Sequence, residues 1–216
     1  MIRAILFDLD GLLIDSEPVH YKCWREALAA VGVTLEREVY LDHWFRAGLA
    51  ITDFCRIHKL NQRPDAIREH KARLYEKLLI TDLELMPGAR QCLESHWKQK
   101  RLALATGGYI EAVNPALEKH DLRKFFDAIV TRQDVKHHKP DPEVFLLAAK
   151  RLGVAPGECV VLEDAEIGIR AAHAAGMYSV AIPTATSRNA DFSLADAVWP
   201  SLHAATPAAI ETLARE

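Results

Sequence analysis

The chain has 216 residues, of which 50% are hydrophobic and 26% are charged, a composition typical of a globular protein and not of a disordered, collagen-like or coiled-coil chain. Lys and Arg number 27 against 30 Asp and Glu, and neither sign forms a long run, so we expect no nucleic-acid partner. At roughly 150 residues per domain, this length predicts one domain with a large insertion.

No feature of the sequence points to a membrane or to an oxidising compartment. The apolar runs are far shorter than the roughly 20 residues that a membrane-spanning helix needs. Asp8 and Asp10 interrupt the first run before it could serve as the core of a secretory signal. The four cysteines form no Cys-x-x-Cys pair, which is typical of reduced, buried thiols. We expect a cytoplasmic protein that is a monomer or a weak dimer.

Short apolar runs with strand character alternate with helical stretches along the chain. They lie at residues 2–8, 101–106, 128–131, 159–163 and 179–183. Such alternation is typical of a parallel sheet covered by helices. The runs are almost continuously apolar, as expected for strands that are buried on both faces. The sequence therefore predicts an α/β fold with a central parallel sheet.

Residues 17–82, between the first run and the second, carry helical signals. Ser16 is placed to cap a helix, Pro18 fits its first turn, and Gly32 marks its end. Further along, apolar residues recur at helical spacing at Leu41, Trp44, Phe45 and Leu49. We expect an all-helical insertion over residues 17–82, with the core formed by residues 1–16 and 83–216.

Two aspartates alternate at the end of the first apolar run. At a spacing of two residues, Asp8 and Asp10 point the same way at the carboxyl edge of the sheet, where open α/β folds bind their ligands. Two carboxylates this close repel each other unless a cation or a shared proton relieves them. Mg²⁺, which prefers oxygen ligands, would do so. The alternative is that Asp10-Gly11 is only a turn.

A second acidic pair, Glu163 and Asp164, ends the buried run at residues 159–163. Asp164 alone could be the N-cap of the helix that follows. Two strands that both end in carboxylates favour a metal site over two turns. The sequence therefore predicts metal ligands at both strand ends.

Two further segments are suited to binding a phosphate group. Thr106-Gly107-Gly108 follows the predicted strand at residues 101–105, and backbone N–H groups beside glycines can surround a phosphate oxygen. Lys139 precedes a proline that fixes the loop before a helix. Each signal is weak alone, and Lys139 could be an exposed loop residue.

Four separated segments together carry a family pattern. In chain order they are residues 8–17 (DLDGLLIDSE), 106–107 (TG), 139–142 (KPDP) and 163–164 (ED), the last followed by Gly168, Ala171, Ala172 and Gly176. On these segments the chain resembles the haloacid dehalogenase superfamily, and most closely the branch that includes β-phosphoglucomutase and phosphoglycolate phosphatase. The resemblance implies a Rossmann-like parallel-sheet core with an inserted all-helical cap that selects the substrate.

The resemblance also implies a mechanism. Asp8 would attack phosphorus to form an aspartyl phosphate, and Asp10 would protonate the leaving oxygen and later activate water. The phosphoryl oxygens would be bound by Thr106, Gly107 and Lys139. The Mg²⁺ ligands would be Asp8, the backbone carbonyl of Asp10, Asp164 and, directly or through water, Glu163. The expected activity is a phosphatase acting on a small phosphorylated metabolite.

The insertion offers weaker candidates for substrate contacts, at His20, Trp44, Arg46 and Gly48. For His20 a surface or packing role is the favoured alternative, and Trp44 has the spacing of a core residue. β-Phosphoglucomutase has a basic residue just after the glycine that corresponds to Gly48, whereas this chain has Leu49-Ala50-Ile51. This difference favours a phosphatase over a mutase. A binding protein of the same fold without turnover is a further alternative.

Overall fold

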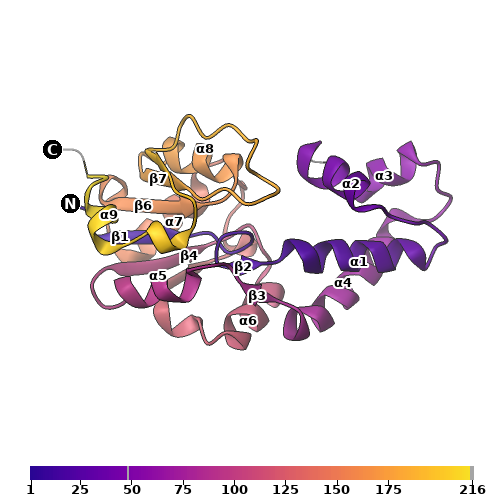
Figure 1. Cartoon of the computed structure of the whole chain (residues 1–216), viewed down its shortest axis with the longest axis horizontal. Helices are drawn as coiled ribbons and strands as arrows, with labels where there is room; N and C mark the ends of the chain where they lie inside the picture. The colour runs from indigo at the N-terminus through magenta and orange to yellow at the C-terminus, as the bar shows by residue number, and fades with distance from the viewer. Residues whose placement is uncertain (48, 215–216) are drawn as a thin grey trace. The chain divides into compact units, whose positions relative to one another are not determined.

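A computed structural model describes residues 1–47 and 49–214, without the side chains of Phe45 and Arg46. The chain divides into two compact units, which we call the core unit (Met1–Asp15 with Glu84–Glu216) and the helical unit (Ser16–Leu83). Their boundaries lie one residue from those expected from the sequence. Figure 1 shows the strands and the C-terminal half of the chain in the core unit, and α1 to α4 in the helical unit.

The core unit is built on a six-stranded sheet in the order β5-β4-β1-β6-β7-β8, and all of its neighbouring pairs are parallel. The strands are β1 (Ala4–Phe7), β4 (Arg101–Ala105), β5 (Ala128–Val130), β6 (Cys159–Glu163), β7 (Tyr178–Ala181) and β8 (Ala197–Val198). Five of the six correspond to the predicted apolar runs, which confirms the α/β fold class. A second, antiparallel ladder joins β2 (Ile14–Asp15) to β3 (Glu84–Leu85).

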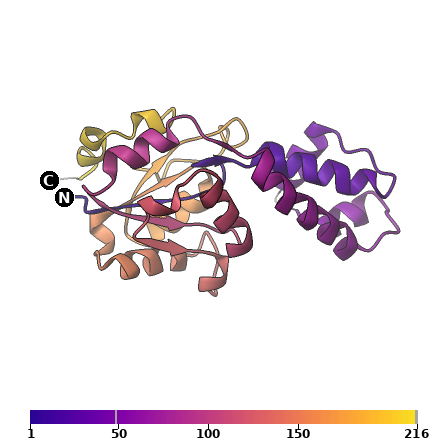
Figure 2. The same cartoon turned by 90° about the horizontal axis from the view of Figure 1, so that it is seen from below.

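Helices cover both faces of this sheet. They are α5 (Ala89–His96), α6 (Ile110–Lys119), α7 (Glu143–Leu152), α8 (Glu166–Ala174) and α9 (Pro207–Glu211). Figure 2 shows α5 and α9 on one side of the sheet and α7 and α8 on the other. The α7 and α8 side contains an apolar cluster whose members include Phe145 of α7, Ala171 of α8, and Ala4 and Leu6, two alternate residues of β1. Burial on both faces explains why these strands are apolar throughout.

The register of the sheet brings three strand ends to one level. Phe7, the last residue of β1, lies opposite Leu104 on β4 and Leu162 on β6. The next residue of each segment, Asp8, Ala105 or Glu163, is therefore at the carboxyl edge of the sheet. Central strands of a parallel sheet thus place groups from distant parts of the chain side by side.

The helical unit consists of α1 (Glu17–Ala29), α2 (Arg37–Tyr40), the π-helix η1 (Leu41–Arg46), α3 (Ile51–Ile57) and α4 (Pro64–Thr81). Its buried cluster includes Leu28, Tyr40, Phe54 and Ile67. Ser16 does precede α1, but its side chain makes no capping hydrogen bond, so the predicted cap is a backbone position only. Gly32 follows α1 with a φ of +79°, the left-handed conformation that a helix-ending glycine commonly adopts.

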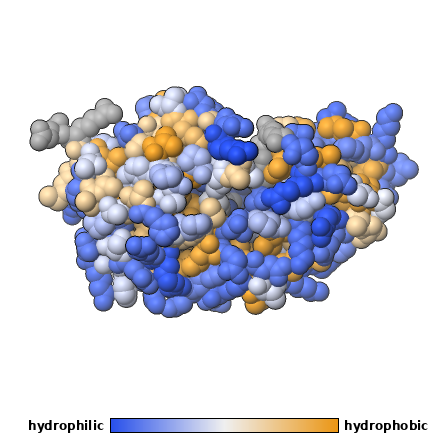
Figure 3. Space-filling view, in the orientation of Figure 1, coloured by the Kyte–Doolittle hydropathy of each residue, from blue (hydrophilic) through white to orange (hydrophobic). Residues whose placement is uncertain are grey.

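One face of the molecule shows the mixed surface that is common in globular proteins (Figure 3). Figure 3 shows hydrophilic and hydrophobic residues interspersed on the face that it draws, with hydrophilic residues in the majority. Among the described residues, no helix combines the length and the apolar character that a membrane crossing requires.

Candidate active site

The site is organised around Asp8, immediately after β1. Its side chain is held inside the core unit, and the residue is 7% exposed. The Asp8 backbone N–H donates to the carbonyl of Leu162 at 3.2 Å, which continues the β1–β6 ladder by one residue. The Asp8 carboxylate is therefore anchored by the sheet itself and has little freedom to move.

Lys139 brings a positive charge to this carboxylate. Its Nζ donates to Asp8 Oδ1 at 2.6 Å, to Glu163 Oε1 at 2.7 Å and to the carbonyl of Ala105 at 3.0 Å. Burial by itself lowers the pKa of Lys139, but the carboxylates of Asp8 and Glu163 more than compensate and raise it above its usual value. Lys139 is therefore a buried, charged residue. It is not an exposed loop lysine.

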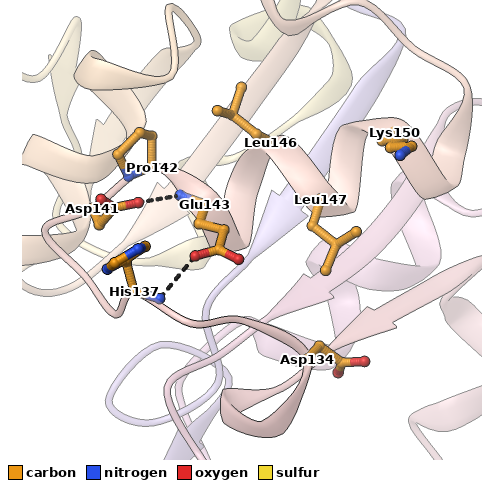
Figure 4. A pocket seen from close by; sticks show the side chains of 8 residues that line it. All are labelled: Asp134, His137, Asp141, Pro142, Glu143, Leu146, Leu147 and Lys150. Carbon is orange, nitrogen blue, oxygen red and sulfur yellow. Dashed lines mark hydrogen bonds between the residues drawn. The ribbon is translucent and has the colours of Figure 1, made fainter.

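Two carboxylates fix the loop that carries Lys139. Glu143, in the first turn of α7, accepts from the backbone N–H of Lys136 at 3.1 Å and of His137 at 2.8 Å. Asp141 accepts from the N–H of Glu143 at 2.9 Å. Figure 4 shows the last two of these bonds beside a surface pocket between the loop and α7. None of the predicted site residues lines that pocket, so it is separate from the candidate site.

Glu163 and Asp164 end β6 next to Asp8. Glu163 is 2% exposed, and its Oε2 accepts from the backbone N–H of Ala165 at 3.0 Å. Burial, followed by the charges of Glu163 and Asp8, raises the pKa of Asp164 well above its usual value. The cause is a local excess of negative charge in a place that water reaches poorly.

This excess fits a cation. One oxygen each from Asp8, Glu163 and Asp164 lies within 4.8 Å of the others, close enough to share one metal ion. A hard divalent ion that prefers carboxylate oxygens would relieve their repulsion. Only glycine fits beside Asp164 at position 11. A Cβ there would lie 2.8 Å from Cγ of Asp164, and the φ of Gly11 is +79°, in the left-handed region. The predicted ligands Asp8, Glu163 and Asp164 thus come together in a suitable arrangement.

Asp10 and the phosphate-loop residues lie near one another. Leu9 to Ile14 form a tight turn in which the N–H of Gly11 donates to the carbonyl of Ile14 at 2.9 Å. A Cβ on Gly108 would be 3.7 Å from Asp10 Oδ2 and 3.3 Å from Thr106 Oγ1. The Asp10 carboxylate is therefore close to the loop that follows β4.

Thr106 is buried at the end of β4, and its Oγ1 accepts from the N–H of Gly108 at 2.9 Å. Gly107 is exposed, and a Cβ there would meet nothing within 4 Å. Because Thr106 Oγ1 accepts this bond, its own O–H can still donate a hydrogen bond to a ligand. The N–H of Gly107, in the same short segment, is a second donor. These groups form an edge of the site that is suited to an anion.

Of the four residues predicted to contact the substrate, the structure describes the side chains of two, His20 and Trp44, both in the helical unit. The His20 ring stacks on Tyr75, with 4.3 Å between centroids, and Nδ1 lies 2.8 Å from Nζ of Lys71. Burial, and then the charge of Lys71, lower the pKa of His20 well below its usual value. Trp44 stacks on Trp24 at 4.8 Å, so its ring takes part in packing within this unit. Gly48 and the side chain of Arg46 lie outside the described residues.

Sequence reasoning assigned no individual role to two groups of the core unit's site, and it missed one partner of His20 in the helical unit. The Ala105 carbonyl binds Lys139, and a carbonyl contact leaves no trace in residue type. Lys71, beside His20, was missed because it stands in a helix rich in charged residues. Gly168, in the first turn of α8, lies against the side chain of Glu163. A glycine inside a helical pattern was the available signal, because glycine disfavours helices and often has a packing reason there.

Comparisons with known proteins identify the family of the chain. A family model of haloacid dehalogenase-like hydrolases matches residues 2–176. Fructose-1-phosphate phosphatase YqaB of Escherichia coli K12 is 35% identical over 181 residues, which cover 82% of this chain and 94% of the relative. Hexitol phosphatase B of the same strain is 34% identical over 209 residues, 93% of each chain.

The fold is also similar to that of a solved structure. The crystal structure of CbbY from Rhodobacter sphaeroides in complex with phosphate has a TM-score of 0.83 and 28% identity, over 98% of this chain and 100% of that chain. The chain therefore belongs to the haloacid dehalogenase-like hydrolases, in the branch that includes β-phosphoglucomutase and phosphoglycolate phosphatase.

Proposed function

We propose that the protein is a magnesium-dependent phosphatase, a phosphoric monoester hydrolase that acts on a small phosphorylated metabolite of the sugar-phosphate class. The observation that carries this proposal is the buried ion pair between Lys139 and Asp8 beside the carboxylates of Glu163 and Asp164. It combines a fixed nucleophile, a positive charge for a phosphoryl group and a set of metal ligands in one place.

In the first step, a carboxylate oxygen of Asp8 forms a bond to phosphorus while the bond from phosphorus to the ester oxygen breaks. Asp10 donates a proton to the departing oxygen, so that the alcohol leaves neutral. In the second step, Asp10 takes a proton from water, the oxygen of water bonds to phosphorus, and the bond to Asp8 breaks. Inorganic phosphate is released, and both aspartates return to their starting states.

The surrounding groups stabilise the charge that the phosphoryl oxygens carry during transfer. Lys139 supplies a full positive charge, and Thr106 and the Gly107 N–H supply hydrogen-bond donors from the end of β4. Because these groups are fixed by the sheet and by the loop before α7, they need no rearrangement when the charge develops. Such preorganised donors are a large part of enzymatic phosphoryl transfer.

The metal site would use Asp8, Asp164 and the backbone carbonyl of Asp10, with Glu163 directly or through water. When bound there, Mg²⁺ neutralises charge on the carboxylates and the phosphoryl group. The carboxylates supply the oxygen donors that this ion prefers. The proposal is supported by the short distances among Asp8, Glu163 and Asp164.

The substrate class is inferred from relatives. The names fructose-1-phosphate phosphatase and hexitol phosphatase describe enzymes that are 35% and 34% identical to this chain. We propose that the helical unit acts as a cap that selects the substrate, with His20, Trp44, Arg46 and Gly48 as candidate contacts. We further propose a cytoplasmic monomer or weak dimer.

The second candidate is a β-phosphoglucomutase activity, which the branch of the family makes relevant. The apolar sequence Leu49-Ala50-Ile51 argues against it, because a mutase needs a basic group for the second phosphate of its bisphosphate intermediate. A mutase would interconvert hexose phosphates faster than it hydrolyses them, and only with a bisphosphate activator. A non-catalytic binding protein would bind phosphate esters without releasing phosphate.

The test is a phosphate-release assay with purified protein, Mg²⁺ and a panel of sugar and polyol phosphates. We expect the wild type to release inorganic phosphate, EDTA to abolish the release, and Asp8→Asn to be inactive. Equal release by the wild type and Asp8→Asn would refute the aspartyl-phosphate mechanism. Isomerisation of a hexose phosphate that exceeds hydrolysis would favour the mutase.

A further inference from the structure

The side chain of Glu163 lies flat against the first turn of α8, at the place where Gly168 has no side chain. A Cβ built on Gly168 would overlap the Glu163 carboxylate and would lie 2.6 Å from its Cγ. Non-bonded carbon atoms do not approach this closely, because their optimal separation is about 3.5 to 4.0 Å and repulsion rises steeply at shorter distances. Glu163 can occupy its observed position only because residue 168 is glycine.

The position of Glu163 matters because both of its carboxylate oxygens are already engaged. Oε1 accepts from Lys139 at 2.7 Å, and Oε2 accepts from the N–H of Ala165 at 3.0 Å. The side chains of Glu163 and Lys139 are 2% and 8% exposed. If Glu163 moved away, a buried ammonium group would lose one of its two carboxylate partners, which is costly in a place that excludes water.

We propose that Gly168 is a positioning residue for Lys139. Its missing side chain lets Glu163 pack against α8, and Glu163 then fixes the ammonium group beside Asp8. This inference rests on the proposed function in one respect: it takes Lys139 to be the group that binds the phosphoryl oxygens.

Two different roles for Gly168 and Glu163 would give different results. If Gly168 only allows α8 to pack on the sheet, Gly168→Ala would destabilise the protein whether or not Glu163 is present. If Glu163 acts only as a metal ligand, its removal would raise the Mg²⁺ concentration needed for half-maximal activity and would leave phosphate affinity unchanged at saturating Mg²⁺. Under our proposal the effect of Gly168→Ala on stability depends on Glu163, and phosphate binding is weakened even at saturating Mg²⁺.

The experiment is a double-mutant cycle on the full chain with Gly168→Ala, Glu163→Ala and the double variant. The control is Gly157→Ala, since a Cβ at Gly157 meets nothing within 4 Å and its φ is not in the left-handed region. Thermal unfolding measures the steric part of the proposal. We expect Gly168→Ala to lower the melting temperature by roughly 5 °C in the wild-type background, as for an overpacked core, and to have little effect in the Glu163→Ala background.

Binding of inorganic phosphate in the presence of Mg²⁺, measured by calorimetry, tests the connection to Lys139. We expect Gly168→Ala, Glu163→Ala and the double variant each to weaken phosphate binding by roughly 10- to 100-fold, the range for a hydrogen bond to a charged group. Gly157→Ala should bind as the wild type does. Wild-type phosphate affinity in Gly168→Ala, or equal destabilisation by Gly168→Ala in both backgrounds, would overturn the proposal.

The same set of proteins separates this inference from the proposed function. If the wild type releases no phosphate from any ester, the proposed function fails, while the unfolding and phosphate-binding measurements still decide the role of Gly168. If the wild type is active and Glu163→Ala needs far more Mg²⁺ but binds phosphate normally, the inference fails and the proposed function stands.

Discussion

The ammonium group of Lys139 lies 2.6 Å from Oδ1 of Asp8, although the two residues are 131 positions apart in the chain. The contact joins a strand end to a loop before α7 and depends on the parallel register of β1, β4 and β6. Both side chains are largely buried, and Lys139 also contacts Glu163, so one buried ammonium group compensates the charge of two carboxylates. The first prediction concerns the removal of this charge.

Replacing Lys139 with alanine removes the positive charge that faces the phosphoryl group. We expect Lys139→Ala to lower kcat/KM by roughly 100- to 1,000-fold, the usual effect of losing one preorganised electrostatic group. Steady-state assays on the best substrate of the panel measure this loss. Lys139→Arg keeps the charge with a different shape and should retain more activity than the alanine variant. A loss below threefold in Lys139→Ala would contradict the assigned role.

Asp164 is expected to be the ligand whose loss most affects metal affinity. Its side chain is half-buried, and burial, followed by the charges of Glu163 and Asp8, raises its pKa, so a cation stabilises its ionised form. We expect Asp164→Asn to raise the Mg²⁺ concentration for half-maximal activity at least tenfold. Asp191→Asn, on an exposed loop, is the matched control. An unchanged Mg²⁺ requirement in Asp164→Asn would remove Asp164 from the metal site.

The four cysteines should be protected in the folded protein. All four are free and buried. Burial raises the pKa of Cys92 to about 12 and that of Cys23 and Cys159 to about 11. Because the thiolate is the reactive form, we expect slow reaction with Ellman's reagent at pH 8 and rapid reaction of four thiols in denaturant. Rapid modification of the native protein would show that a thiol is accessible.

The sequence predicted the parts of this structure that depend on which residues are buried and on how apolar residues are spaced along the chain. Continuous apolar runs identified the central strands, and acidic residues at the ends of two of them identified Asp8 and Glu163 as neighbours, since carboxyl ends of parallel strands share one edge. The two-residue strand β8 was missed, because two residues carry no pattern. The π-helix at Leu41–Arg46 was read from its spacing as an ordinary helix.

The roles of single groups within the site were harder to predict. Lys139 resembles an exposed loop lysine until the fold buries it between two carboxylates. The overlap between Gly168 and Glu163 depends on the direction of one side chain relative to a neighbouring helix, and residue type alone does not encode that direction. Here the sequence indicates only that a glycine stands where a helix would normally avoid one.

The last prediction concerns His96 and the response of stability to pH. His96 is fully buried at the end of α5, where its Nε2 lies 2.8 Å from the carbonyl of Ala205. Its Nδ1 is buried without a hydrogen-bond partner among the described residues. Burial, only partly offset by the contact with Ala205, lowers the pKa of His96 in the folded protein. The folded protein therefore holds a neutral imidazole.

The sign of the effect follows from this lowered pKa. Above the unfolded-state value of about 6.5, His96 is neutral in both states and does not change stability with pH. Below it, the unfolded chain binds a proton that the folded protein refuses, so stability falls as the pH falls, by at most about 1.4 kcal/mol per pH unit. Urea unfolding at pH 7.5 and pH 5.5 measures the change. We expect His96→Gln to lose part of this pH dependence, whereas His173→Gln, at an exposed position, should keep it. An identical pH dependence in His96→Gln and the wild type would show that other groups cause it.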